Sequence, residues 1–242
     1  RGLGVRRVLI GIENNKKDAI EHLTKLAGQF EGMEVHALKV KYPQGAEKQL
    51  IKALIGREVP SGKLPIEVGA VVNNAGTAFA VYEAVQKNKP LVERVVTVTG
   101  TTVGKPSNFM TRIGTPVAEL LEKAEADLDN TGKIISGGPM MGKALTSIDA
   151  PVTKGTSGLL LMNQAEARRV DSKTCIRCAR CVRACPMALE PYLLSNLSKH
   201  KKFEETQPER IMDCIECGSC QYICPSGLPL LDNIRVGKQQ LG

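Results

Sequence analysis

Two copies of one cysteine pattern constrain the fold of this 242-residue chain more than any other feature. All eight cysteines lie in its C-terminal part, at Cys175, Cys178, Cys181, Cys185, Cys214, Cys217, Cys220 and Cys224. Each group of four reads C-x2-C-x2-C-x3-C-P, because a proline follows the fourth cysteine both times. Two intervening residues let one tight turn carry successive thiols to a common centre, and the proline redirects the chain afterwards. The pattern predicts a separate C-terminal domain built around these thiols.

The spacing matches the ligand run of bacterial-type ferredoxins, in which the fourth cysteine of each run binds the cluster of the other run. On that rule, one [4Fe–4S] cluster is held by Cys175, Cys178, Cys181 and Cys224. The other cluster is held by Cys214, Cys217, Cys220 and Cys185. We therefore expect a ferredoxin-type domain with two [4Fe–4S] clusters at residues 171–242.

Two other uses of the cysteines are weaker. A disulfide framework suits small secreted domains, whereas this chain has a long cysteine-free part and no apolar leader in its first residues. Structural zinc sites use paired C-x2-C units, and the third and fourth cysteines of each run exceed what a tetrahedral site needs. The chain also begins at Arg1 without an initiator Met, so we expect it to be a fragment of a longer protein.

Residues 1–90 alternate between strand and helix patterns, which predicts part of a parallel, Rossmann-like sheet. Apolar runs predict three strands, at Val8–Ile12, Glu34–Val40 and Val68–Val72. Helices are predicted after a cap at Asn14 or Asn15 with an apolar face reaching Phe30, at Ala46–Ile55 and at Thr77–Val85. Ligands of such sheets bind beyond the carboxyl ends of the strands, where Glu13, Asn73 and Asn74 fall.

Residues 91–150 predict a small β-grasp domain of the SLBB type. Strands are expected at Glu93–Thr101, Phe109–Ile113 and Lys133–Ile135, around a helix that starts at Pro116 and runs to Lys123. The loop Gly137–Gly142 lacks the glycine order of a dinucleotide or phosphate fingerprint. We interpret it as a tight turn, with a ligand or partner contact as the alternative.

Residues 151–170 are expected to connect the β-grasp domain to the cysteine domain. Between the two cysteine runs, Leu189, Leu193, Leu194 and Leu197 repeat at helical spacing, which predicts a helical linker with a packed apolar face. The predicted fold class is α/β: a partial Rossmann-like parallel sheet, then the β-grasp domain, then a mostly helical two-cluster ferredoxin domain.

This order of parts resembles the RnfC family, the peripheral subunit of the ion-translocating ferredoxin:NAD+ oxidoreductase (Rnf) complexes. The resemblance extends along the whole chain, through Tyr42–Leu50, Gly56–Pro60, Gly137–Gly142, Pro151–Gly158 and both cysteine runs. The first domain is also similar to the flavin-binding subunit of respiratory complex I. That second similarity is carried by Glu13 and by an Asn-Asn-x-x-Thr element at Asn73, Asn74 and Thr77.

The resemblance implies an oxidoreductase and translocase subunit that passes electrons between a flavin and NADH site and its partner subunits, through the two clusters. FMN and NAD(H) would be bordered by Glu13, Asn73, Asn74 and Thr77. The family's flavin loop would precede Arg1, so we expect an incomplete flavin site. From these residues alone, Glu13 could equally be a solvated carboxylate, and the asparagines could end a strand and cap a helix.

The implied partners are the other Rnf subunits, NAD(H) and, indirectly, ferredoxin-type electron carriers. The implied location is peripheral, on the cytoplasmic face of the cell membrane, since no apolar run in the chain approaches a membrane span. We expect no catalytic acid, base or nucleophile in the cysteine domain. His22, His36 and His200 are isolated in sequence and are interpreted as structural residues.

Two other function classes remain as alternatives. A net charge of +8 and a pI near 9.1 suggest a nucleic-acid-binding iron–sulfur or zinc protein. Against this, the basic residues are dispersed, and aromatic residues for base stacking make up only 3% of the chain. We therefore expect no nucleic-acid partner, and the basic excess offsets the charge of the clusters. The second alternative is the flavin and iron–sulfur subunit of a soluble hydrogenase or NADH dehydrogenase.

Overall fold

The computed structural model describes residues 4–242, which divide into two compact units. The first unit extends to Val72 and includes residues 212–215. The second unit comprises residues 73–211 and 216–242. Among the described helices, none is long and apolar enough to span a bilayer.

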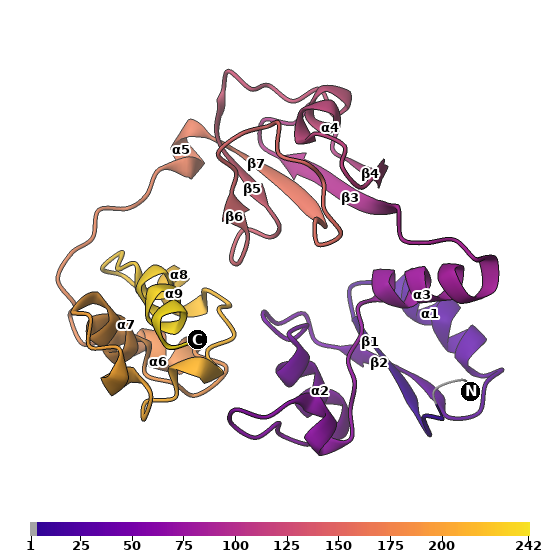
Figure 1. The fold of residues 1–242 in the computed structure, drawn as a ribbon, viewed down its shortest axis with the longest axis horizontal. Helices are drawn as coiled ribbons and strands as arrows, with labels where there is room; N and C mark the ends of the chain where they lie inside the picture. Colours follow the sequence, from indigo (N-terminus) through magenta and orange to yellow (C-terminus); the bar gives the residue numbers. More distant parts are fainter. Residues whose placement is uncertain (1–3) are drawn as a thin grey trace. The chain divides into compact units, whose positions relative to one another are not determined.

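The first unit is built on a parallel pair of strands (Figure 1). Strand β1 (Val8–Glu13) pairs with β2 (Met33–Leu38) through the crossover helix α1 (Lys17–Ala27), with Glu13 opposite Leu38. Helix α2 (Glu47–Ile55) follows and packs on β1. At their closest approach, a Cβ atom on Gly11 would lie 2.9 Å from Leu50 Cδ1. The strand–helix alternation that the sequence predicts is confirmed here, and the sheet of this unit has two strands.

Three local expectations for this unit are wrong. The residue preceding α1 is Lys16, so neither Asn14 nor Asn15 caps the helix. Phe30 lies beyond the end of α1, with 58% of its surface exposed. The run Val68–Val72 is not a strand: a 3₁₀ turn (Pro65–Val68) ends at Gly69, whose left-handed φ of 71° diverts the chain from extended geometry.

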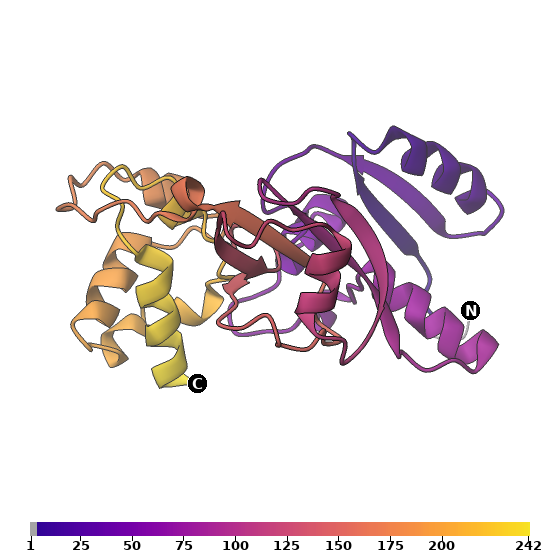
Figure 2. The ribbon, with the colours of Figure 1, turned by 90° about the horizontal axis from the view of Figure 1, so that it is seen from above.

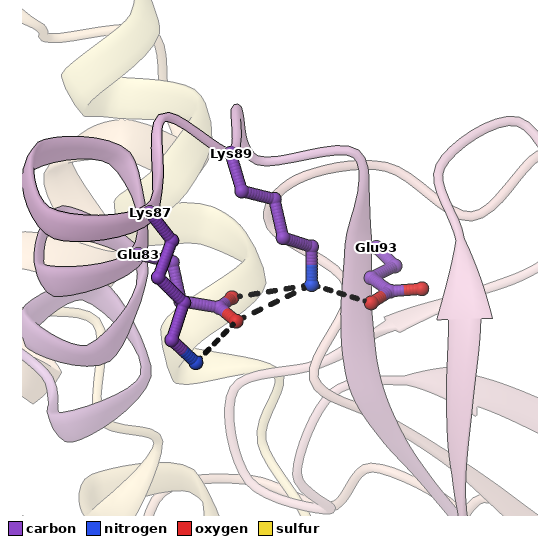
Figure 3. Close-up of polar contacts among 4 residues, drawn as sticks. All are labelled: Glu83, Lys87, Lys89 and Glu93. Carbon is purple, nitrogen blue, oxygen red and sulfur yellow. Dashed lines mark hydrogen bonds and ion pairs between the residues drawn. The ribbon is translucent and has the colours of Figure 1, made fainter.

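The second unit begins with α3 (Ala75–Lys87), whose last turn is tied to the strand that follows it. Lys89 Nζ lies 3.3 Å from Glu83 of α3 and 2.7 Å from Glu93, the first residue of β3 (Glu93–Gly100). Figure 3 shows Lys89 between these two carboxylates and Lys87 as a further partner of Glu83. One lysine therefore bridges the helix and the first strand of the next domain.

The central part of the second unit is a five-stranded mixed sheet with the order β4-β3-β7-β5-β6. Besides β3, its strands are β4 (Ser107–Arg112), β5 (Thr131–Ser136), β6 (Lys143–Ala144) and β7 (Gly158–Asn163). Helix α4 (Val117–Lys123) contributes three buried side chains to the core of this domain. Buried positions alternate along the strands, as in Val96 and Val98 of β3 and Leu159 and Leu161 of β7. The helix and the three strands predicted for residues 91–150 are confirmed.

The sheet also corrects an expectation for the segment 151–170. Strand β7 lies in that segment and pairs in parallel with β3 on one side and antiparallel with β5 on the other. Part of the expected connector is therefore the central strand of the sheet. Its apolar run Leu159–Leu161 packs into the core, because a central strand has neighbours on both edges.

The cysteine domain is mostly helical, as expected. After α5 (Gln164–Ala167) it contains α6 (Arg180–Ala184), α7 (Pro191–Lys199), α8 (Ser219–Tyr222) and α9 (Leu230–Leu241). Figures 1 and 2 show α7 and α9 side by side, and a Cβ atom on Gly237 of α9 would lie 2.3 Å from Ser198 Oγ of α7. Leu194 and Leu197 of α7 are buried, which confirms the predicted helical linker. Helix α9 follows the second cysteine run, where the sequence patterns predict no helix.

Candidate metal centres

The two cysteine runs share one backbone conformation. In the first run Arg177 and Ala179 have φ values of 54° and 55°, and in the second run Glu216 and Gly218 have φ values of 55° and 78°. Left-handed conformations at non-glycine residues cost about 1–2 kcal/mol each. Two such residues in each run turn the chain sharply between successive cysteines. The short helices α6 and α8 then begin at the same place in each run, directly after the second left-handed residue.

One cavity in the cysteine domain gathers thiols from both runs. Its volume is about 1080 Å³, and its lining includes Cys175, Cys178, Cys181 and Cys224. Protein pockets that hold small ligands span about 300–1,000 Å³, so the cavity has room for a cubane cluster. The three thiols of the first run and the last thiol of the second therefore line the same space.

The environment of Cys181 fits a sulfur that bears negative charge. Burial raises the pKa of its thiol, while backbone N–H groups of Tyr192 and Val182 hydrogen-bond to the sulfur and oppose that shift. Tyr192 is in the first turn of α7 and also lines the cavity. Amide groups directed at a ligand sulfur are a common feature around iron–sulfur clusters, where they stabilise the anionic form.

The remaining cysteines are less exposed. Cys217 and Cys220 each expose 7% of their surface, and Cys185 and Cys214 are half-buried. The backbone N–H of Leu189 donates to Cys185 Sγ at 3.4 Å. Cys217 Sγ lies 3.5 Å from the hydroxyl of Ser219. Buried sulfurs with amide and hydroxyl groups close to them have the same chemical character as the sulfurs that line the first cavity.

The thiols are spread out and do not converge on one point. Within residues 4–242, no three Cys, His, Asp or Glu side chains are placed to hold a single metal ion. The eight cysteines form no disulfide in this described range. Ligands to a cubane bind different irons at its corners, so they surround the cluster at a distance from one another. The donor set of thiols around a roomy cavity fits a cluster of this kind.

The residues expected near a flavin lie in different units. Glu13 is the last residue of β1 in the first unit, and its side chain is exposed. Asn73, Asn74 and Thr77 belong to the second unit. Asn74 caps α3, because its Oδ1 accepts a hydrogen bond of 2.8 Å from the N–H of Gly76. Thr77 is exposed on the first turn of that helix.

The three histidines occupy ordinary positions. His22 lies in α1 and His200 directly follows α7. His36 lies in β2, and its Nε2 is 3.1 Å from the carboxylate of Glu34 on the same strand. The sequence reasoning missed a different charged group, in which Glu216 of the second cysteine run meets two cations of α9. The basic residues Arg235 and Lys238, three positions apart, were the available signal.

Three family models match consecutive parts of the chain. Residues 1–83 match the Nuo51 FMN-binding domain, residues 95–144 match the SLBB domain, and residues 167–225 match the 4Fe-4S dicluster domain. These matches bear out the predicted order of a flavin-type α/β domain, a β-grasp domain and a two-cluster domain. They also assign the cysteine runs to a domain family that carries two [4Fe–4S] clusters.

Curated relatives match along the chain, and each is the C subunit of an oxidoreductase complex. That of the Na(+)-translocating ferredoxin:NAD(+) oxidoreductase of Acetobacterium woodii is 44% identical over 241 residues, covering 100% of this chain and 54% of its own length. The proton-translocating counterpart of Clostridium ljungdahlii is 45% identical over 209 residues, covering 86% of this chain and 45% of its own length. The counterpart from the ion-translocating oxidoreductase complex of Pasteurella multocida is 40% identical, covering 97% and 28%.

The chain thus spans about half, or less, of the length of these relatives. Identities of 40–45% far exceed what a shared fold alone requires, and the matches include both cysteine runs. Over its entire length, this chain is therefore homologous to part of the RnfC family, the C subunits of the ion-translocating ferredoxin:NAD(+) oxidoreductase complexes.

Proposed function

We propose that this chain is the cluster-bearing, electron-transfer part of a membrane-associated, ion-translocating ferredoxin:NAD+ oxidoreductase. It would pass electrons between a flavin and NADH site and the partner subunits of the complex, on the cytoplasmic face of the membrane. The cavity lined by Cys175, Cys178, Cys181 and Cys224 carries this proposal, because it gathers the ligand set that ferredoxin spacing requires. The names of the relatives, which are subunits of such complexes, support it.

The proposed ligand sets follow the exchange of the fourth cysteine. Cys175, Cys178, Cys181 and Cys224 would hold one [4Fe–4S] cluster. Cys214, Cys217, Cys220 and Cys185 would hold the other. When bound, a cluster of this type accepts and releases one electron at a time.

The protein around the thiols has three tasks in this function. Backbone N–H groups near Cys181 and Cys185 stabilise negative charge on the sulfurs, which favours the reduced state. The burial of Cys217 and Cys220 keeps water from the second set of ligands. The exposed position of Cys175 leaves one edge of the first site accessible from solvent, where an electron partner can approach.

On the flavin side we propose that Glu13, Asn73, Asn74 and Thr77 border FMN and NAD(H). The match of residues 1–83 to an FMN-binding domain supports this proposal. The variant N74D separates a flavin contact from the capping role, because an aspartate caps a helix as well as an asparagine does. We expect N74D to keep the stability of the protein and to weaken FMN binding in a fluorescence titration of a protein that contains the whole subunit. Unchanged FMN affinity would remove Asn74 from the proposed site.

Metal and sulfide analysis tests the central proposal. The chain, purified without oxygen, should be brown and contain about eight irons and eight sulfides, as two cubanes require. Reduction should produce the EPR signals of two reduced [4Fe–4S] clusters. Stoichiometric zinc without iron would contradict the electron-transfer function.

A further inference from the structure

The two cysteine runs differ in charge at one equivalent position. Glu216 precedes Cys217 just as Arg177 precedes Cys178, and both residues adopt left-handed backbone conformations. The runs therefore repeat in backbone geometry but present opposite charges beside the second ligand. Charges next to a cluster change the free energy of adding an electron, so the two sites are electrically different.

Glu216 is held by two cations from α9. Its Oε2 lies 3.0 Å from Arg235 Nε, and its Oε1 lies 2.8 Å from Lys238 Nζ. Residues three positions apart share one face of a helix, so both cations reach the same carboxylate. The three side chains expose 34%, 26% and 20% of their surface, which makes the group less screened than ion pairs in open solvent.

The carboxylate of Glu216 is ionised at neutral pH. Burial alone would raise the pKa of this group, but the hydrogen bonds from Lys238 and Arg235 outweigh that effect and hold the pKa below its usual range. Glu216, Arg235 and Lys238 together carry one more positive than negative charge. The three residues form the α9 clamp.

Helix α9 is itself firmly placed. Leu230, Leu231 and Ile234 of α9 are buried. The N–H of Leu231 donates to Gln221 Oε1 of the second run at 2.9 Å, so the run contacts α9 at two separate points. A terminal nitrogen of Arg235 also donates to the carbonyl oxygen of Met141, in the loop Gly137–Gly142, at 3.2 Å. A rigid helix therefore holds the loop that carries Cys217.

We propose that α9 positions the second cysteine run through Glu216, and that Arg235 and Lys238 raise the reduction potential of the cluster held by that run. The proposal rests on the proposed function, since it requires a bound cluster. Reduction makes a cluster more negative, so a nearby cation favours the reduced form and a carboxylate opposes it. Because two cations surround one carboxylate, the α9 clamp as a whole favours reduction.

The test uses the 242-residue chain with its clusters, purified without oxygen. The variants are E216Q, K238Q and K238R, with K105Q as the control. Lys105 pairs with the exposed Glu125 outside the cysteine domain, and its loss changes the net charge as K238Q does. Iron per chain is measured first, and the midpoint potentials of both clusters are then measured by redox titration monitored by EPR.

We expect one of the two midpoints to move and the other to stay. E216Q should raise that midpoint, K238Q should lower it, and K238R should leave it near the wild-type value. A merely structural clamp would not give shifts of opposite sign. Shifts of the same sign in E216Q and K238Q, or shifts no larger than in K105Q, would overturn the electrostatic part of the proposal.

The positioning part has its own readout. Iron release to an excess of chelator, followed by absorbance, should be faster in E216Q than in K105Q. Equal rates in these two variants would overturn it. Wild-type protein without about eight irons would instead contradict the proposed function itself, so the two failures are distinguishable.

Discussion

Cys181 and Cys224 belong to different cysteine runs but line the same cavity. C224S should therefore damage the cluster proposed for Cys175, Cys178 and Cys181, and reduce the iron content from about eight to about four per chain. C178S should leave the same remaining EPR signal as C224S, whereas C217S should leave the other one. If the remaining signal of C224S matches that of C217S instead, the exchange of the fourth ligand is wrong.

The β-grasp core gives a prediction that is independent of cofactors. Leu121 of α4 exposes only 1% of its surface and packs among the buried side chains of β3 and β7. L121A should lower the free energy of unfolding by about 2–5 kcal/mol, because it removes buried methyl groups and leaves a cavity. V95A, at a residue that is 53% exposed, is the control and should change it by about 0.5 kcal/mol or less. Urea unfolding measured by circular dichroism distinguishes the two, and equal effects would contradict the assigned core.

The cap of α3 gives a second stability prediction. Asn74 Oδ1 accepts the N–H of Gly76, which would otherwise have no partner within the helix. N74A should lower the free energy of unfolding by about 1 kcal/mol, while N74D should preserve it. N73A serves as the neighbouring control in the same urea experiment. A loss in N74D as large as that in N74A would show that the cap is not the source of the effect.

Local patterns predict most of this molecule. The cysteine spacing indicates the metal centres because consecutive ligands of a cubane lie within a few residues of one another. Alternating side chains locate β3, since Val96 and Val98 face one side of the sheet. The strand β7 resembles a connector in the sequence, because its position between β3 and β5 depends on partners far away along the chain.

Other features could not be predicted for the same physical reason. The run Val68–Val72 has the composition of a strand, but Gly69 adopts a left-handed conformation and the chain turns. The contact between Glu216 and Lys238 joins residues that are distant in sequence, and it forms only because α9 packs beside α7 and α8. Sequence reasoning found the ligands of the clusters but missed the charges that surround one of them.

The bridge between α3 and β3 should make stability depend on pH at both extremes. The hydrogen bond from Lys89 lowers the pKa of Glu93 from its ordinary value of 4.5, and the hydrogen bond to Glu93 raises the pKa of Lys89 from 10.5. The stabilisation from Glu93 is therefore present above the unfolded pKa and is lost as the pH falls through the lowered, folded pKa. The stabilisation from Lys89 is complete below the unfolded pKa and is lost as the pH rises through the raised, folded pKa.

E93Q removes the partner that contributes most to both shifts. We expect this variant to be less stable than the wild type near neutral pH, with the difference shrinking below pH 4.5 and above pH 10.5. E119Q, on the exposed face of α4, is a control with the same change in charge and no shift of this kind. Thermal unfolding across this pH range, followed by circular dichroism, measures the difference. A constant gap between E93Q and the wild type at every pH would mean that the carboxylate of Glu93 acts through packing and not through its charge.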